Sequence, residues 1–245
     1  MFCCRRIFLI LLCLGASLPA QAIVNGTAVS DEHFAEKYPW LVTVVNDLNG
    51  GICGGVLVAP RWVLTAAHCS WGMRHVLVGH AERSQARRVD VERAIRHPDF
   101  SYDTLQNDAA LLYLEESVNI APAPLASAMQ ARMLLRDGVL GIITGWGVTE
   151  DSATPVDRVR EAVIRLEKYA RVGSRYAYDY NAGPCGRDSG SPMLIQTIAG
   201  EWLVVGIANA TSGNLCASGG GMAVYTSLAA VADFVRRRVT TEAND

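Results

Sequence analysis

Three short segments of this chain hold residue types that together can do nucleophilic chemistry. A serine, Ser189, lies in a turn rich in glycine and proline (184–192), directly after Asp188. A histidine, His68, ends one apolar segment, and an aspartate, Asp108, opens another. A serine hydroxyl is a weak nucleophile until a base takes its proton and hydrogen-bond donors stabilise the oxyanion that forms. The three segments therefore predict a hydrolytic site if the fold brings them together.

Each segment alone also has an ordinary structural interpretation. Gly, Pro, Ser and Asp are the usual residues of surface turns, and a histidine beside an apolar strand is more often a core or surface residue. The chain order His68, Asp108, Ser189 narrows the choice. Subtilisins have the order Asp, His, Ser, and the nucleophile elbow of α/β-hydrolases needs a glycine where this chain has Arg187.

In this order and in its flanking motifs the chain resembles the trypsin/chymotrypsin family of serine proteases. The resemblance covers residues 23–245. Its further motifs are Ile23-Val24-Asn25-Gly26, Tyr38-Pro39-Trp40, Cys53-Gly54-Gly55, Gly145-Trp146-Gly147 and Val224-Tyr225-Thr226. The resemblance implies an all-β fold of two packed six-stranded antiparallel β-barrels with a C-terminal α-helix, and a cleft between the barrels that holds the catalytic residues.

The distribution of apolar residues favours the same fold class. Short β-branched and aromatic runs alternate with turns, as at 40–45, 55–58, 62–66, 76–78, 109–114, 139–144, 162–166, 192–197 and 202–208. Residues 226–239 instead have apolar side chains at helical spacing and predict one C-terminal helix. The stretch 118–130, with two prolines, predicts an extended connector between a first barrel of about 23–125 and a second of about 126–225.

The N-terminus has the pattern of an export signal. Arg5 and Arg6 precede an apolar run, and Ala20-Gln21-Ala22 matches a signal peptidase site, so residues 1–22 are expected to be removed. The run is too short to span a membrane as a helix, and we expect a secreted or periplasmic protein without membrane attachment after processing. Losing two arginines moves the formal net charge from −2 to about −4, and no basic stripe predicts nucleic-acid binding.

Cysteine usage agrees with export. Outside the signal, four cysteines remain: Cys53, Cys69, Cys185 and Cys216. They allow three pairings that the sequence alone does not separate, and the family resemblance implies Cys53–Cys69 and Cys185–Cys216. There is no paired C-x-x-C motif, and the paired acids of the family's calcium loop are missing. Neither a metal nor a cofactor is therefore expected.

The resemblance also gives each site residue a role. Ser189 is expected to attack the scissile carbonyl while His68 takes its proton and Asp108 holds the imidazole in place. The backbone N–H groups of Arg187 and Ser189 are expected to form the oxyanion hole.

A further expected pair joins the N-terminus to the nucleophile turn. In the family, a freed N-terminal Ile ammonium pairs with the aspartate before the nucleophile, here Ile23 and Asp188. Leaving such a buried carboxylate unpaired is costly, so the pair is expected to order the oxyanion loop. A signal peptidase cut after Ala22 produces Ile23 directly, and we therefore expect an enzyme without a zymogen stage.

By alignment with the family, the primary substrate pocket involves Gly183, Thr211 and Ala223. Family members that cleave after Lys or Arg have an aspartate where this chain has Gly183. Thr211 and Ala223 stand where glycine is frequent, so a narrow, uncharged pocket is expected. Such a pocket favours small or medium apolar residues on the acyl side of the bond, with modest discrimination.

Arg187 departs most from the family, which almost always has glycine there. A residue in a glycine-type conformation is strained, and we expect instead an ordinary φ at this position. Its N–H would then still serve as an oxyanion donor, while its long side chain crowds the leaving-group side of the cleft.

The expected partners of a monomeric enzyme of this kind are protein or peptide substrates and protein protease inhibitors. Two other classes stay open: a catalytically impaired homologue that acts as a binding protein, and a non-catalytic secreted β-protein of unrelated fold. The complete triad argues against the first, and the joint match of so many motifs argues against the second.

Overall fold

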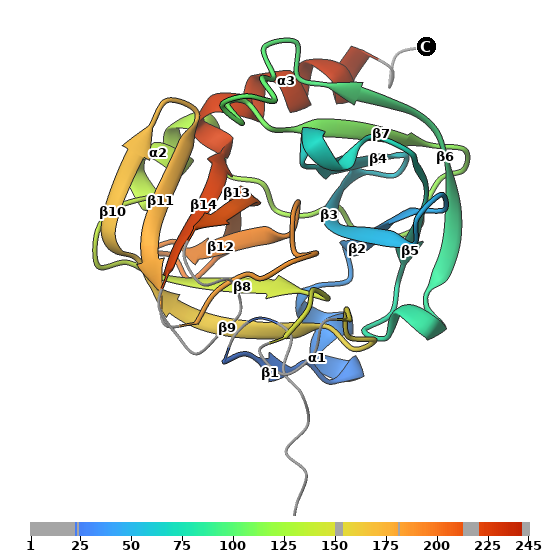
Figure 1. The fold of residues 1–245 in the computed structure, drawn as a ribbon, viewed down its shortest axis with the longest axis horizontal. Helices are drawn as coiled ribbons and strands as arrows, with labels where there is room; N and C mark the ends of the chain where they lie inside the picture. Colours follow the sequence, from blue (N-terminus) through green and yellow to red (C-terminus); the bar gives the residue numbers. More distant parts are fainter. Residues whose placement is uncertain (1–22, 24, 150–153, 181, 213–220, 242–245) are drawn as a thin grey trace, which may run out of the picture.

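The computed structural model describes residues 23, 25–149, 154–180, 182–212 and 221–241, so the predicted signal segment 1–22 lies outside its described part. Two β units lie side by side (Figure 1). The first is a closed antiparallel barrel in the order β2-β3-β4-β7-β6-β5. Its strands are β2 (Leu41–Asn46), β3 (Gly51–Ala59), β4 (Trp62–Thr65), β5 (Met73–Val78), β6 (Arg87–Arg96) and β7 (Ala110–Leu114). The first of the two predicted six-stranded barrels is confirmed.

Burial of apolar side chains explains most of these strands. Every residue of β4 is buried, as are most of β2, β3 and β7, and each fully buried Val or Leu contributes roughly 1.5–3 kcal/mol. The strand β6 was absent from the predicted strands because its sequence carries four arginines and much of it is exposed. Its buried Val89 pairs with Val76 of β5, which closes the barrel.

The second unit is an eight-stranded sheet in the order β1-β9-β8-β12-β13-β14-β11-β10. Its strands are β1 (Thr27–Ala28), β8 (Leu140–Gly145), β9 (Arg160–Arg165), β10 (Glu167–Val172), β11 (Arg175–Tyr180), β12 (Pro192–Gln196), β13 (Trp202–Ser212) and β14 (Gly221–Ser227). Only Leu166 separates β9 from β10, although the two lie near opposite ends of the strand order. One bent segment of chain thus contributes a strand near each end of the sheet. The unit differs from the predicted second six-stranded barrel because this segment is divided into two strands and because β1 is added.

The described residues form three α-helices beside the sheets: α1 (Asp31–Lys37), α2 (Ala128–Leu134) and α3 (Leu228–Thr241). None of these three is long and apolar enough to cross a membrane. The C-terminal helix was predicted. The connector at 118–130 was predicted to be extended, but its end belongs to α2. Ser127 caps this helix by accepting from Gln130 N, while the Gln130 side chain accepts from Ser127 N. This capping box satisfies two backbone donors and was an overlooked signal for the helix.

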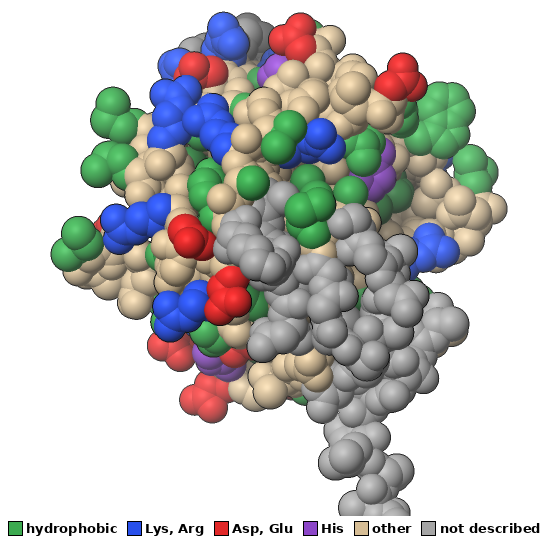
Figure 2. Space-filling model, turned by 60° about the vertical axis from the view of Figure 1, so that its left-hand side comes forward, with side chains coloured by type: hydrophobic (Ala, Val, Ile, Leu, Met, Phe, Trp, Pro, Cys, Tyr) green, Lys and Arg blue, Asp and Glu red, His purple; other side chains and the backbone are tan. Residues whose placement is uncertain are grey.

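Helix α3 packs mainly against α2, β13 and β14, and it also reaches the barrel. The Phe234 ring on α3 lies 5.0 Å from the ring of His97, which directly follows β6. On the face drawn in Figure 2, exposed hydrophobic side chains are scattered among charged and polar ones. The C-terminal helix therefore contacts both β units and helps to fix their relative position.

The barrel and the second sheet meet where β3 contacts the turn that carries Ser189. Gly54 N donates to Ser189 O at 2.8 Å, and Thr65 Oγ1 donates to Gly54 O at 2.7 Å. Gly190 has φ +81°, and a Cβ there would lie 2.3 Å from Gly54 O, so only glycine fits. This close backbone contact fixes the turn against the barrel.

Candidate active site

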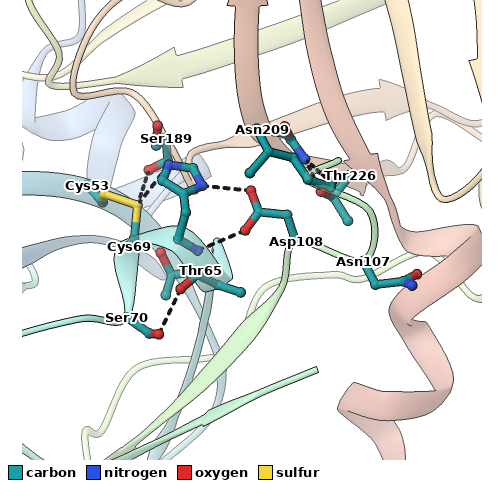
Figure 3. A network of polar contacts seen from close by, with 12 residues as sticks. Cys53, Thr65, Cys69, Ser70, Asn107, Asp108, Ser189, Asn209 and Thr226 are labelled. Carbon is teal, nitrogen blue, oxygen red and sulfur yellow. Dashed lines mark hydrogen bonds and ion pairs between the residues drawn. A yellow bond between two sulfur atoms is a disulfide. The ribbon is translucent and has the colours of Figure 1, made fainter. Parts of the chain in front are cut away.

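His68 and Asp108 form a closely bonded pair on the barrel. His68 lies in a 3₁₀ turn (Ala67–Cys69) directly after β4, and Asp108 lies just before β7, the strand paired with β4. His68 Nδ1 donates to Asp108 Oδ2 at 2.7 Å, and His68 N donates to Asp108 Oδ1 at 2.9 Å (Figure 3). Because a carboxylate only accepts, the ring proton is on Nδ1, which leaves Nε2 as the basic nitrogen.

The loop before Asp108 is held by residues of the second unit. Asn107 N donates to Ser174 Oγ at 2.6 Å, and Ser174 N donates to Gln106 Oε1 at 2.7 Å. Asn209 Nδ2, on β13, donates to Leu105 O at 2.9 Å. These bonds tie the loop to the unit that holds the nucleophile. They fix the buried carboxylate of the pair without contacting it.

Asn209 makes a second bond of the same kind, since its Nδ2 also donates to Thr226 Oγ1 at 3.0 Å. Sequence reasoning did not find the supporting residues Gln106, Ser174 and Thr226. Each is an ordinary polar residue in its own segment, and only the tertiary fold brings it to the loop.

Ser189 lies beside the imidazole of His68. The sulfur of Cys69 is 3.6 Å from His68 Nε2 and 3.8 Å from Ser189 O, and Figure 3 shows Ser189 next to the Cys53–Cys69 disulfide. The described contacts include no hydrogen bond from Ser189 Oγ to His68 Nε2. Such bonds are often long or poorly aligned in an unliganded site and tighten when substrate is bound.

The predicted disulfide beside the histidine is present. Cys53 on β3 and Cys69 are joined, with a Cα–Cα distance of 6.3 Å, so the residue after His68 is cross-linked to the strand that contacts the nucleophile turn. Cys185 is buried, and its predicted partner Cys216 lies outside the described residues.

The predicted oxyanion donors lie together at the start of the turn. Within the described part of the chain, neither Arg187 N nor Ser189 N has an acceptor, whereas Asp188 N donates to Cys185 O at 3.2 Å. Both N–H groups are therefore available to donate to an oxyanion, which needs such donors. The expected ordinary backbone at Arg187 was wrong: its φ is +76°, in the left-handed region that favours glycine, at a cost of about 1–2 kcal/mol.

Asp188 is a fully buried carboxyl group, and among the described residues its donors are backbone N–H groups. Its oxygens accept from Gly147 N at 2.8 Å and from Cys185 N at 2.9 Å. A Cβ on Gly145 or Gly147 would lie 2.0 or 2.5 Å from atoms of this carboxyl group, so the Gly145-Trp146-Gly147 motif makes room for it. Burial raises the pKa of Asp188 to about 7, against the opposing effect of the two N–H bonds.

Ile23, the predicted partner of Asp188, is also fully buried, with φ +53°. In the chain described here its nitrogen belongs to a peptide bond and carries no charge. The Asp188 carboxyl group makes no ion pair with any described residue.

The apolar pocket beside Ser189 has a volume of about 120 Å³. It is lined without any charged side chain by Pro184, Cys185, Gly186, Ser189, Ala208, Asn209, Ala210 and Thr211. Of the three predicted pocket residues, Thr211 lies in this lining. Gly183 is buried directly before it in sequence, and Ala223 is the buried partner of Thr211 on the neighbouring strand β14.

Across the described residues there is no cluster of three or more His, Cys, Asp or Glu side chains that could hold a metal ion.

Comparison with known protein families then decides what the chain is related to. The family model described as Trypsin matches residues 23–235. The chain belongs to the trypsin family.

Several curated proteins are similar to this trypsin-family chain. It is 28% identical to human chymotrypsin-like elastase family member 3B, with 92% of each chain covered. It is 29% identical to human transmembrane protease serine 5 over 90% of this chain and 52% of that protein. It is 27% identical to mouse vitamin K-dependent protein C over 86% of this chain and 50% of that protein. The chain therefore spans about half the length of the last two relatives.

The buried Asp188 predicts how the stability of this trypsin-family chain depends on pH while the nitrogen of Ile23 is in a peptide bond. Its pKa is raised on folding, so the folded state holds its proton more tightly than the unfolded state. Below pH 3.8 this group therefore does not lower the free energy of unfolding. As the pH rises to about 7, the free energy of unfolding falls by about 4 kcal/mol. Denaturant unfolding of a chain with an uncharged peptide before Ile23, measured from pH 4 to pH 8, checks this loss.

The matched control is Asp188→Asn, which has no proton to release at this position. The difference in unfolding free energy between the two chains is expected to change with pH by the amount above. Parallel pH profiles for the two chains would contradict the role given to this carboxyl group.

Proposed function

We propose that this trypsin-family protein is an exported serine endopeptidase that hydrolyses peptide bonds through an acyl-enzyme intermediate. The observation that carries the proposal is the His68–Asp108 pair. It fixes the ring proton on Nδ1 and presents the basic Nε2 on the side where Ser189 lies. A catalytically impaired homologue that acts as a binding protein is the alternative to be tested.

The proposed reaction follows from these positions. Ser189 Oγ attacks the scissile carbonyl carbon as His68 Nε2 takes its proton, and the carbonyl π electrons move to the oxygen. Collapse of this tetrahedral intermediate expels the amine, which receives the proton from His68. Water then repeats the sequence on the acyl-enzyme, and Ser189 regains its proton. Buried Asp108 stabilises the imidazolium in both halves of the reaction.

The donors at the turn start supply the second requirement of this reaction. The carbonyl oxygen becomes negative in the intermediate, and Arg187 N and Ser189 N are the donors proposed to stabilise it. Removing one such donor from a related enzyme costs about 3–4 kcal/mol of transition-state stabilisation. The fixed contact between Gly54 and Ser189 O supports the alignment of these donors.

Covalent labelling tests the enzyme proposal directly. A fluorophosphonate probe is expected to label the folded protein, because it reacts with a serine that a neighbouring base activates. Ser189→Ala should abolish labelling and lower peptide hydrolysis by roughly a millionfold. Labelling is read by gel fluorescence and mass spectrometry.

Ser84→Ala, a change at an exposed serine outside the site, is the matched control and should label normally. A folded wild-type protein that does not react with the probe would instead favour the binding-protein alternative.

We further propose that the enzyme cleaves after small or medium apolar residues. The pocket beside Ser189 is small and has no charged residue in its described lining, and Gly183 stands where a carboxylate would select Lys or Arg. Mass-spectrometric profiling of a cleaved peptide library should give Ala, Val or similar residues at the acyl side, with less than about a hundredfold preference among them. A profile dominated by Lys or Arg would contradict the proposal.

Export and the absence of a zymogen stage belong to the same proposal. A cut after Ala22 frees the Ile23 ammonium, and the buried Asp188 has two N–H donors but no described cation to neutralise it. N-terminal sequencing of the exported protein should find Ile23 as the first residue. A mature start upstream of Ile23 would require a separate activation step.

A further inference from the structure

The side chain of Arg187 leaves the nucleophile turn in a defined direction. The acyl-side pocket lies between residues 184–186 and strand β13, and Arg187 is not part of its lining. Its Nη1 instead lies 2.8 Å from the position that a Cβ on Gly51 would occupy, at the start of β3. The guanidinium therefore extends from the second unit to the start of β3 on the barrel, outside the pocket lining.

The local backbone makes room for this crossing. A side chain on Gly51 would meet both Arg187 Nη1 and Asn49 Oδ1, each at 2.8 Å, so the absence of a side chain there lets the guanidinium rest over the strand. Asn49 Oδ1 already accepts from Gly51 N at 2.8 Å. Among its described neighbours, Arg187 has neither a hydrogen-bond acceptor nor an ion-pair partner.

Several other arginines that are at least partly exposed are paired with acids, whereas Arg74, Arg136 and Arg238 have no acidic partner among the described residues. Arg61, Arg87, Arg88 and Arg158 each form an ion pair with Asp or Glu. The acid on the nearby β2–β3 hairpin, Asp47, is itself engaged by His75 at 2.9 Å and Arg88 at 3.3 Å. Arg187, two residues before Ser189, thus has no acidic partner among the described residues.

We propose that Arg187 is a specificity-determining residue that binds a carboxylate on the leaving-group side of the substrate. A guanidinium presents planar N–H donors that match a carboxylate, and a peptide offers one on Asp or Glu or at its C-terminus. With the acyl-side residue in the pocket beside Ser189, the chain after the scissile bond runs past Arg187. The preferred substrate carries an acidic residue at the first or second position after that bond. This inference rests on the proposed endopeptidase function.

Paired peptides that differ by one charge test the proposal. Labelled acetyl-Ala-Ala-Pro-Val-Glu-Ala-amide and acetyl-Ala-Ala-Pro-Val-Ala-Glu-amide are each compared with the peptide that has Gln in place of Glu. Wild-type kcat/KM should favour at least one Glu peptide by roughly 3- to 10-fold at low salt, and 0.5 M NaCl should reduce the ratio. In Arg187→Gln the ratio should fall to about 1.

The matched control is Arg136→Gln, which removes the same charge from an exposed loop after α2 and should keep the wild-type ratio. The Arg187→Gln variant keeps a non-glycine residue in the same strained backbone. Each Glu-to-Gln ratio compares two peptides on one enzyme, so a change in the overall rate of that enzyme does not alter the ratio. Arg187→Lys keeps the charge without the planar fork and should retain part of the preference.

A binding measurement separates this proposal from the proposed function. The dissociation constants of the same peptides for Ser189→Ala are measured by fluorescence anisotropy, with and without Arg187→Gln, and require no hydrolysis. A protein that fails to react with fluorophosphonate but binds Glu peptides through Arg187 refutes the enzyme and supports the carboxylate site. A Glu-to-Gln ratio near 1 with Arg187 present, or one that persists in Arg187→Gln, overturns the carboxylate site.

Discussion

The backbone contact between β3 and the nucleophile turn is the constraint on which the site depends. His68 and Asp108 belong to the barrel, whereas Ser189 belongs to the other β unit, so no local sequence holds them together. Gly54 N bonds to Ser189 O, and the absence of a side chain at Gly190 allows the two backbones to approach. A backbone contact of this kind is more rigid than a pair of flexible side chains. The loop before Asp108 is instead anchored to the second unit by hydrogen bonds that involve side chains.

The two buried aspartates Asp108 and Asp188 differ in the groups that surround their carboxyl oxygens. Asp108 accepts two bonds from a single histidine, one from its backbone and one from its ring, so its charge faces the group that would become positive in the proposed reaction. The described donors to Asp188 are two neutral N–H groups, and the pKa of Asp188 is raised because burial outweighs them. Asp108 therefore has its hydrogen-bond partners in the folded chain. Asp188 would be stabilised by a cation, which the described residues do not supply.

Motif order and apolar runs predicted the segments of His68, Asp108 and Ser189, the β fold and the C-terminal helix. The six-stranded barrel and the Cys53–Cys69 disulfide came from the family resemblance, because the sequence alone left three cysteine pairings open. The sequence did not predict β6, because its many charged residues leave too few apolar side chains to form a recognisable strand pattern. The φ of Arg187 also could not be inferred, since a turn defined by its tertiary contacts imposes that conformation on whichever residue stands there. Ser174 and Asn209 support the site through hydrogen bonds to residues far away in the sequence, and such bonds leave no pattern along the chain.

The pairing of β1 with β9 has a consequence for how the molecule folds. Thr27 pairs with Glu161 and Ala28 with Arg160, and all six barrel strands lie between them in sequence. The barrel is built from one continuous stretch of chain, so its contacts close shorter loops than the β1–β9 pairing does. We therefore expect the barrel to form first and the N-terminal strand to dock late. The segment after Ile23 is then among the last parts of the chain to reach the unit that carries the nucleophile.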